Sequence, residues 1–333
     1  MTAPPGIAEM LVARGLADDP AALVFTPLTG GVSSDIWHVT GGPVAVCVKR
    51  ARPQLAVAAI WMAPVERNHY EAEFLRVAGA EIPGLAPDLL AEDRELGLIV
   101  LPYLDPGRWQ LWKPQLLAGQ VNVEVARNVG LHLGRLARAT RDRPDLARRF
   151  DTSALFHDLR LDPYLLECAR KHPDMADRLT GLADGTAARR EALVHGDVSP
   201  KNIMVSADAT AIILDAEAAW YGDPAFDLAF VLNHLLLKAV YRPEAAAPLR
   251  RAMAALLDGR AASDAPEAVA AVQDRATALL PGLLLARVDG KSPVEYLIDP
   301  NAQATVRNVA RRFLVTPAAH PLEIAAALSG GTA

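Results

Sequence analysis

The sequence has few cysteines, no excess of basic residues and no long apolar run, and each absence excludes a class of protein. Two cysteines in 333 residues, Cys47 and Cys168, do not make a disulfide scaffold. A net charge of -5 argues against a nucleic-acid groove, because phosphate binding requires a basic excess. No stretch approaches the roughly 18 consecutive apolar residues of a membrane span, and the N-terminal residues do not predict a signal peptide. We therefore expect a cytoplasmic protein that binds neither nucleic acid nor membrane.

The N-terminal third mixes short apolar strands with turns. Hydrophobic residues make up 51% of the chain, which is enough to bury a substantial core in one large domain or two lobes. Val44–Lys49 and Leu98–Leu101 are predicted strands, because each is a short apolar run bounded by glycine and proline. Between them, the spacing of the apolar residues predicts a helix over Arg67–Gly79.

The rest of the chain is rich in alanine, leucine and arginine, and its apolar spacing is mostly helical. The predicted helices are Val123–Ala139, Tyr164–Arg170, Ala225–Val240, Ala245–Leu257, Pro266–Leu280 and Ala302–Phe313. One segment of β-type residues, Ala192–Asp215, interrupts them. We therefore predict an α+β, two-lobed fold, with a small β-rich N-terminal lobe over residues 1–104 and a larger, mostly helical C-terminal lobe over residues 105–333.

The most informative segment carries polar residues at the ends of short strands. Asp197 follows one predicted strand, Asn202 comes five residues later, and Asp215 ends a further strand, followed by Glu217. Phosphoryl transfer needs a base for the acceptor hydroxyl and oxygen ligands that hold Mg²⁺ on the nucleotide phosphates. The alternative is that these residues are unrelated turn acids and a helix-capping asparagine. Four polar residues in register, each at a strand end, argue against this alternative.

These residues also carry a family resemblance. The segments HGDVSPKN, LDAE and GDPAFDLA resemble the catalytic core of the aminoglycoside phosphotransferase and choline kinase superfamily. The resemblance implies a protein-kinase-like fold with ATP and Mg²⁺ as cofactors. It also implies that Asp197 is the catalytic base, Asn202 a magnesium ligand and Asp215 the main metal-binding acid, with Glu217 as the second acid of a D-x-E pair.

The N-terminal region is consistent with this resemblance. A loop with the glycines and serines of TGGVSSD (Gly30, Gly31, Ser33 and Ser34) lets backbone N–H groups approach a phosphate. Lys49 lies downstream on an apolar strand, where kinase-like proteins place the lysine that binds the α- and β-phosphates. Glu71 on the following helix is the predicted partner of Lys49, with Glu73 as the alternative.

Other positions have supporting roles by the same resemblance. Leu101 and Tyr103 are placed against adenine at the predicted hinge between the lobes. Asp227 is expected to support the catalytic loop by hydrogen bonds, and His195 to brace the base. Asp223 is predicted to cap the helix that follows it, with Pro224 at the first helical position.

Within the superfamily, several stretches are most similar to methylthioribose kinases. The segment DAEAAWYG resembles the segment after the metal-binding acid in that family. Its Trp220 is a possible substrate residue, although such a tryptophan more often belongs to the core or to the wall of a cleft. Arg311 and Arg312 are similar to its C-terminal arginine pair, which contacts the sugar, although such a pair is ordinarily the cationic end of a helix. The loop TGGVSSD and Asn202 depart from that family's pattern, so the resemblance leaves the substrate open.

We therefore predict an ATP-dependent small-molecule kinase that phosphorylates a hydroxyl of a sugar, thiosugar or amino alcohol, as a monomer or homodimer. An aminoglycoside-type antibiotic phosphotransferase is one alternative. A nucleotide-binding pseudokinase module without catalysis is another. The joint presence of Lys49, Asp197, Asn202 and Asp215 argues against the pseudokinase, because a degenerate module would be expected to lose at least one of them.

Overall fold

The computed structural model describes residues 5–28, 34–52 and 64–330. The chain divides into two compact units. Unit 1 consists of Met1–Trp109 and Leu214–Glu217, and unit 2 of Gln110–Ile213 and Ala218–Ala333. The domain boundary predicted after residue 104 lies close to the first division, whereas the return of Leu214–Glu217 to unit 1 was not predicted.

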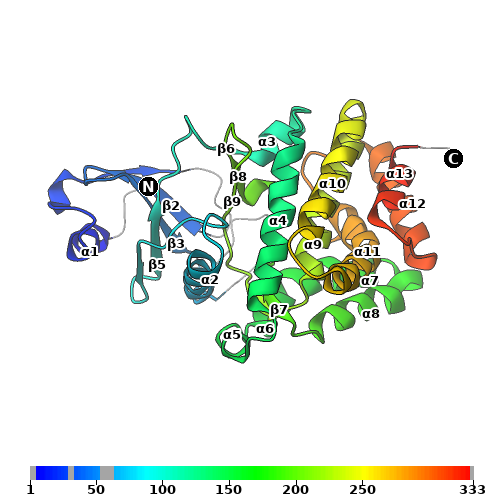
Figure 1. The fold of residues 1–333 in the computed structure, drawn as a ribbon, viewed down its shortest axis with the longest axis horizontal. Helices are drawn as coiled ribbons and strands as arrows, with labels where there is room; N and C mark the ends of the chain where they lie inside the picture. The colour runs from blue at the N-terminus through cyan, green and yellow to red at the C-terminus, as the bar shows by residue number, and fades with distance from the viewer. Residues whose placement is uncertain (1–4, 29–33, 53–63, 331–333) are drawn as a thin grey trace. The chain divides into compact units, whose positions relative to one another are not determined.

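Unit 1 is built on a five-stranded antiparallel sheet with the strand order β1-β2-β3-β5-β4. The strands are β1 (Val24–Pro27), β2 (Ser34–Thr40), β3 (Val46–Ala51), β4 (Ala91–Asp93) and β5 (Leu98–Pro102). Val48 of β3 lies opposite Val100 of β5. Both valines pack in one apolar cluster with Ile7 and Leu11 of helix α1 (Ile7–Ala13), which accompanies the sheet in Figure 1. The two strands predicted here are therefore the centre of a real sheet.

Helix α2 (Arg67–Glu81) lies against β3 and β5, and it runs two residues past the predicted end. Its buried face includes Glu71, Phe74, Leu75 and Ala78, which recur at the three- and four-residue spacing of one helix face. Because side chains alternate along a strand, Lys49 points to the face opposite to its neighbour Val48. The helix period therefore turns Glu71 toward the sheet face that carries Lys49.

Unit 2 is mostly helical, with short strands in two small sheets. The strands are β6 (Gln110–Leu111), β7 (Ala192–Val194), β8 (Ile203–Val205), β9 (Ala211–Ile213) and β10 (Trp220–Gly222), in the orders β6-β8-β9 and β10-β7. The α-helices are α3 (Trp112–Leu117), α4 (Val123–Thr140), α5 (Pro144–Arg149), α6 (Ser153–Phe156), α7 (Glu167–Lys171), α8 (Ala176–Ala187), α9 (Ala225–Tyr241), α10 (Ala246–Ala261), α11 (Pro266–Asp289), α12 (Pro300–Val315) and α13 (Pro321–Leu328). The predicted β-type segment is thus present as three strands with the catalytic motif between them.

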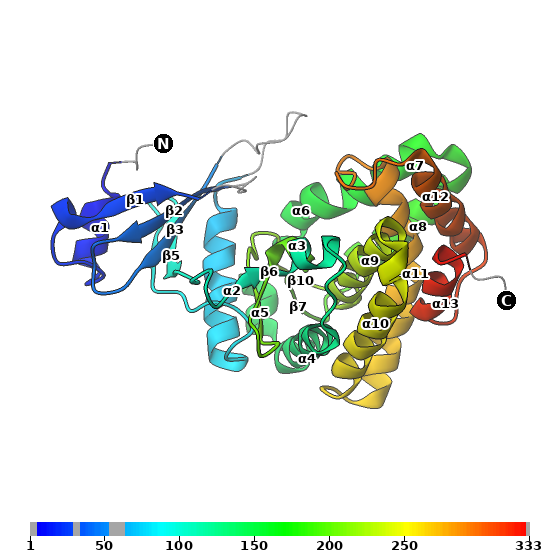
Figure 2. The same ribbon diagram turned by 90° about the horizontal axis from the view of Figure 1, so that it is seen from above.

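The helices of unit 2 pack around α9, whose residues from Ala225 to Ala239 are all buried. Helices α4 and α10 run side by side in Figures 1 and 2 and meet at glycines. A Cβ atom added to Gly130 of α4 would lie 2.0 Å from the carbonyl oxygen of Leu256, and one added to Gly259 of α10 would lie 2.0 Å from that of Arg127. The two backbones are therefore in direct contact.

One predicted helix begins much earlier than expected. A π-helix, His157–Leu166, precedes α7 and runs directly into it, although the sequence predicted a helix only from Tyr164. Pro163 caused the error, because a proline is ordinarily read as a helix break. Proline has no backbone N–H to donate within a helix, yet Pro163 lies inside this π-helix, a type of turn that is frequent at functional sites.

Helix α11 is nine residues longer than predicted, because it continues through Pro281 to Asp289. By length and composition alone, α11 is the one helix among the described residues that could cross a membrane. Just over half, 56%, of its most apolar window is buried inside the structure. A mostly buried core helix passes the same test of length and composition, so α11 is weak evidence for a membrane span.

Candidate active site

In unit 1, Lys49 pairs with two carboxylates. Its ammonium nitrogen lies 2.7 Å from Oε2 of Glu71, and it also forms a short ion pair with Asp215. Lys49 is 5% exposed and Glu71 is 2% exposed, so this pair is shielded from water. The alternative partner Glu73 instead pairs with Arg76 on its own helix. The expected contact of Lys49 with Glu71 is therefore present.

The second acid of the D-x-E segment has a cation of its own. Oε2 of Glu217 lies 2.9 Å from Nε of Arg67, which is fully buried at the start of α2. Asp215, two residues before Glu217, adopts a left-handed backbone conformation, with φ of 70°. Aspartate is among the few residues that tolerate this conformation. The segment Leu214–Glu217 thus carries both acids into unit 1.

Crowding of acids around one ammonium shifts the pKa values in unit 1. Burial by itself lowers the pKa of Lys49, but the carboxylates of Asp215 and Glu71 outweigh burial and hold this pKa above its usual value. Burial raises the pKa of Glu71 to about 7 against the attraction of Lys49, and Asp215 adds to the rise. The lysine is therefore held in its charged form.

In unit 2, the catalytic loop is held by Asp227 of α9. Its two carboxylate oxygens each accept a hydrogen bond of 2.8 Å, one from the backbone N–H of His195 and one from that of Gly196. Burial raises the pKa of Asp227 to about 7, although these two hydrogen bonds oppose the rise. The backbone N–H of Asp197 in turn donates to Nδ1 of His195, at 3.1 Å. Both supporting contacts that the sequence predicted are present.

Asp197 itself lies between two cations. Its Oδ2 is 3.1 Å from Nη2 of Arg160 and 3.1 Å from Nζ of Lys201. Arg160 also donates through Nε to the backbone carbonyl of Gly196. Nδ2 of Asn202 donates to the backbone carbonyl of Asp197 at 3.1 Å, so the metal-ligand role predicted for Asn202 would fall to its Oδ1. The carboxylate of Asp197 is thus fixed from both sides by cations of unit 2.

The sequence matches a family of known enzymes. Residues 24–255, well over half of the chain, match the family described as the phosphotransferase enzyme family. The chain belongs to this family. Its kinase relatives act on hydroxyl groups of small molecules, so this phosphotransferase is an enzyme of that class.

A curated relative and two solved structures illustrate the likeness. Methylthioribose kinase of Geobacillus kaustophilus (strain HTA426) is 26% identical over 272 residues, which cover 73% of this chain and 68% of that protein. The ethanolamine kinase of Plasmodium vivax superimposes with a TM-score of 0.56 at 11% identity, covering 88% of this chain and 84% of that one. Amicoumacin kinase hAmiN, in complex with AMP-PNP, Ca²⁺ and Ami, superimposes with a TM-score of 0.54 at 12% identity, covering 96% of each chain. The two structures show that the phosphotransferase has the predicted kinase-like fold.

Of the other residues predicted to contact the nucleotide, the structure describes some and leaves others outside its described ranges. Gly30, Gly31 and Ser33 lie outside the described residues. Ser34 is buried at the start of β2, and its hydroxyl has no hydrogen-bond partner in the part of the chain that the structure describes. Leu101 lies in β5, as expected of the strand before a hinge. The nucleotide contacts of these five residues stay predictions.

Tyr103, the other predicted adenine neighbour, is already engaged. Its backbone N–H donates to the carbonyl of Ala45 at 3.2 Å, and its ring stacks on that of His38 at 3.6 Å between centroids. A contact to adenine through this N–H would have to break the bond to Ala45. Its place at the hinge stays a prediction.

The predicted substrate residues are not assembled around the catalytic loop in the contacts of the described chain. Trp220 is 1% exposed and stacks on Phe156 at 4.2 Å between ring centroids, so it is a core residue. Arg311 pairs with Asp174, and the guanidinium of Arg312 lies over the ring of its neighbour Phe313. These contacts belong to the end of α12 and do not favour a sugar-binding role.

Three cations of the phosphotransferase were missed by sequence reasoning. Arg67 and Arg160 come from helices far along the chain from the acids they contact, so no local pattern marks them. Lys201 stands inside the motif HGDVSPKN, four residues after Asp197, and its charge was the available signal. All three neutralise acids of the predicted site, which explains how so many carboxylates are tolerated there.

A further group of acids in unit 1 could in principle hold a metal. Among the described residues, ligand atoms of His69, Glu73 and Glu92 lie within 4.8 Å of one another. Arg76, however, pairs with both acids, at 2.6 Å from Glu92. Arg94 is a second cation at Glu92, with its Nε 3.4 Å from Oε1 of that residue. The arginines already neutralise these acids, so the group is a surface ion-pair network.

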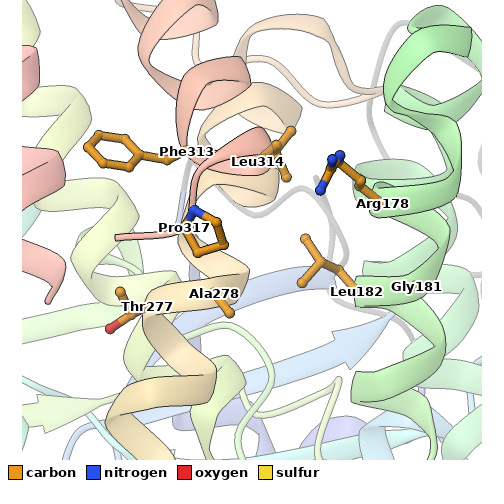
Figure 3. A pocket seen from close by; sticks show the side chains of 8 residues that line it. All are labelled: Arg178, Gly181, Leu182, Thr277, Ala278, Phe313, Leu314 and Pro317. Atoms are coloured by element: carbon orange, nitrogen blue, oxygen red, sulfur yellow. The ribbon is translucent and has the colours of Figure 1, made fainter. Parts of the chain in front are cut away.

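Figure 3 shows a cavity in unit 2, between α8, α11 and α12. Its volume is about 250 Å³. The lining residues are Arg178, Gly181, Leu182, Thr277, Ala278, Phe313, Leu314 and Pro317. None of these residues belongs to the predicted catalytic or metal-binding set, and an acid or base suited to chemistry is absent from this lining. The cavity therefore does not compete with the catalytic loop as the active site.

Proposed function

We propose that the protein is an ATP-dependent small-molecule kinase that transfers the γ-phosphoryl group to a hydroxyl of a sugar, thiosugar or amino alcohol. The observation that carries the proposal is the buried contact of Lys49 with Glu71 and Asp215. A buried lysine fixed by carboxylates keeps its charge and its position, which suits a group that binds nucleotide phosphates. The kinship with methylthioribose kinases supports the thiosugar as one acceptor to test.

In the proposed mechanism, Asp197 accepts the proton of the acceptor hydroxyl. The oxygen so activated attacks the γ-phosphorus, the bond to the β-γ bridging oxygen breaks, and ADP leaves. Arg160 and Lys201 hold the carboxylate of Asp197 in place through their ion pairs. Asp227 holds the backbone of His195 and Gly196, the two residues before Asp197, by hydrogen bonds.

The residues of unit 1 fit a divalent cation. Three buried or half-buried carboxylates, those of Glu71, Asp215 and Glu217, lie close enough to Lys49 to act on its charge. Carboxylate oxygens are also the donors that Mg²⁺ prefers.

We assign the metal to Asp215, Glu217 and the free oxygen of the Asn202 amide. When bound, Mg²⁺ would neutralise charge on the nucleotide phosphates. The proposed location is the cytoplasm, because ATP is available there and both cysteines are free thiols.

The test of the base is Asp197→Asn in an assay that couples ADP release to acceptor phosphorylation. Turnover should fall by about 10²-fold or more, the scale of a positioned general base, while ATP affinity stays near that of the wild type. The panel should contain methylthioribose, ribose, choline, ethanolamine and an aminoglycoside. Tight ATP binding without turnover on any acceptor would instead support a pseudokinase. Near-normal turnover of Asp197→Asn would refute the assignment of the base.

The test of the metal is Asp215→Asn, chosen because asparagine also tolerates the left-handed backbone at this position. The variant should lose the gain in ATP affinity that Mg²⁺ gives the wild type, because a charged oxygen ligand is gone. ATP titrations with and without Mg²⁺ measure this gain. A Mg²⁺-dependent gain equal to that of the wild type would contradict the assignment.

A further inference from the structure

Unit 2 contains a second buried lysine that no catalytic role explains. Lys238 of α9 is 1% exposed, and its ammonium nitrogen lies 5.1 Å from the centre of the Tyr296 ring. Among the described residues it has no hydrogen-bond or ion-pair partner. A charged group without a partner is expensive to bury, and proteins rarely do so unless something else completes the site.

The surroundings of Lys238 are cationic. The nearest charges from other elements are Lys113 of α3 and Arg287 of α11, and both repel a second positive charge. The acid in this neighbourhood is Glu295, which is exposed and pairs with Lys113 at 2.5 Å. Burial, followed by the repulsion of Lys113 and Arg287, lowers the pKa of Lys238 to about 7. The chain thus leaves this position short of negative charge.

The unsatisfied groups near Lys238 are hydrogen-bond donors. The hydroxyl of Tyr296 and Nε of Arg287 are buried and have no partner within the described part of the chain. Arg287 donates its Nη1 to the hydroxyl of Tyr164 at 3.1 Å and to the carbonyl of Ser292 at 2.5 Å. An ammonium, a guanidinium N–H and a phenol together call for a ligand rich in acceptor oxygens. Carboxylate and phosphate groups are such ligands.

Two links join this cluster to the catalytic loop within unit 2. The π-helix carries Arg160, which pairs with Asp197, and one turn later Tyr164, which contacts Arg287. On α9, His234 lies one turn before Lys238. Burial and the charges of Arg287, Lys238 and Lys201 hold the pKa of His234 well below its usual value, and Lys201 is also an ion-pair partner of Asp197. The cluster therefore neighbours the groups that position the base.

We propose that Lys238, Arg287 and Tyr296 bind an anionic group of the acceptor, so that the substrate is a polyhydroxylated anion such as a sugar acid or a sugar phosphate. This inference rests on the proposed kinase function and narrows its acceptor. Cationic acceptors such as choline and ethanolamine would meet repulsion at this cluster.

Matched acceptor pairs test the inference. The pairs are gluconate with sorbitol, ribonate with ribitol, and ribose 5-phosphate with ribose, and the arms separate a carboxylate from a phosphate. We expect kcat/KM for the anionic member of at least one pair to exceed that of the neutral member by about 10-fold or more, the scale of a charge-assisted hydrogen bond. Lys238→Met should reduce this ratio by a similar factor. Equal ratios in wild type and variant, or a preference for neutral members in all pairs, would overturn the inference and leave the kinase function standing.

Two further measurements separate the inference from the kinase function and from misfolding. Calorimetric titration with gluconate, ribonate and ribose 5-phosphate reports binding without turnover, so the subsite is tested even if no acceptor is phosphorylated. Binding that weakens in Lys238→Met supports the subsite, whereas binding that is unchanged or undetectable for all three anions in the wild type overturns it. Lys238→Gln keeps a polar side chain and should show the same loss. Lys171→Met, an exposed lysine of the same unit, is the control and should match the wild type.

Discussion

Lys49 and Lys238 are both buried, yet the structure treats their charges in opposite ways. Lys49 contacts the carboxylates of Glu71 and Asp215, and its pKa is held above the usual value. Lys238 contacts an aromatic ring among cations, and its pKa is lowered to about 7. Equal burial therefore does not set the charge of a lysine, because neighbouring charges decide between the protonated and neutral forms.

The difference indicates what completes each site. At Lys49 the protein supplies its own counter-charges, so the lysine is fixed in the absence of a ligand. At Lys238 the counter-charge is missing from the described residues, and we infer that the acceptor brings it. Removing each lysine should therefore have opposite effects on stability, while both removals impair function.

The largest expected effect follows Lys49→Met. The variant loses the ammonium that we propose binds phosphate, and it leaves Glu71 buried without this partner. We expect turnover to fall by about 10²–10³-fold, the scale of one lost electrostatic contact in an active site. The free energy of unfolding should also fall by about 3 kcal/mol, because breaking a buried pair leaves one charge uncompensated. Steady-state kinetics and urea unfolding measure the two effects, and an unchanged unfolding midpoint would show that the pair is not buried as described.

A double-mutant cycle sharpens the role of Glu71. Glu71→Gln alone should reproduce part of the kinetic loss, because the amide cannot orient the ammonium as a carboxylate does. Lys49→Met combined with Glu71→Gln should be scarcely slower than Lys49→Met alone, since both changes remove one unit of function. Kinetic losses that multiply in the double variant would show that Glu71 acts independently of Lys49. Glu73→Gln, which removes an acid paired with Arg76 on the same helix, is the matched control.

The smallest effect is expected for the stability of Lys238→Met. Replacing an unpaired buried amine by an apolar side chain should leave the free energy of unfolding unchanged or raise it by about 1 kcal/mol at pH 7. The pKa of Lys238 is about 7 when folded and 10.5 in the reference state, so unfolding takes up a proton between these pH values. The advantage of the variant should therefore be complete below pH 7 and shrink toward pH 10. An advantage that grows with pH would show that Lys238 stays charged in the folded protein.

Site residues could be predicted from the sequence where they stand close together in one motif or on one helix face. Asp197 and Asn202 stand five residues apart in one motif, and the apolar spacing of α2 placed Glu71 on the helix face that meets Lys49. Helix ends were less predictable, because Pro163 and Pro281 resemble breaks but lie inside the π-helix and α11. In both cases buried neighbours outweigh the local penalty of the proline.

Residues joined only by the fold could not be predicted. Arg160 reaches Asp197 from a helix that precedes it by nearly forty positions, and nothing in either segment encodes the contact. The cluster around Lys238 combines α3, α9 and α11 with the residues between α11 and α12, so its charge balance exists only in three dimensions. The sequence left Trp220 open between substrate and core for the same reason, because an aromatic residue in a motif does not reveal whether its ring faces a ligand or the core.

The backbone contact between α4 and α10 makes two glycine codons of the gene intolerant of substitution. Glycine to alanine within a helix ordinarily stabilises it by up to about 1 kcal/mol, so such a codon change usually passes unnoticed. At Gly130 and Gly259 the new methyl group would meet a carbonyl oxygen of the facing helix, and the two backbones would have to separate. The segments HGDVSPKN and LDAE would remain intact in such a mutant. A screen for heat-sensitive alleles should therefore recover these two codons, far from any residue that performs chemistry.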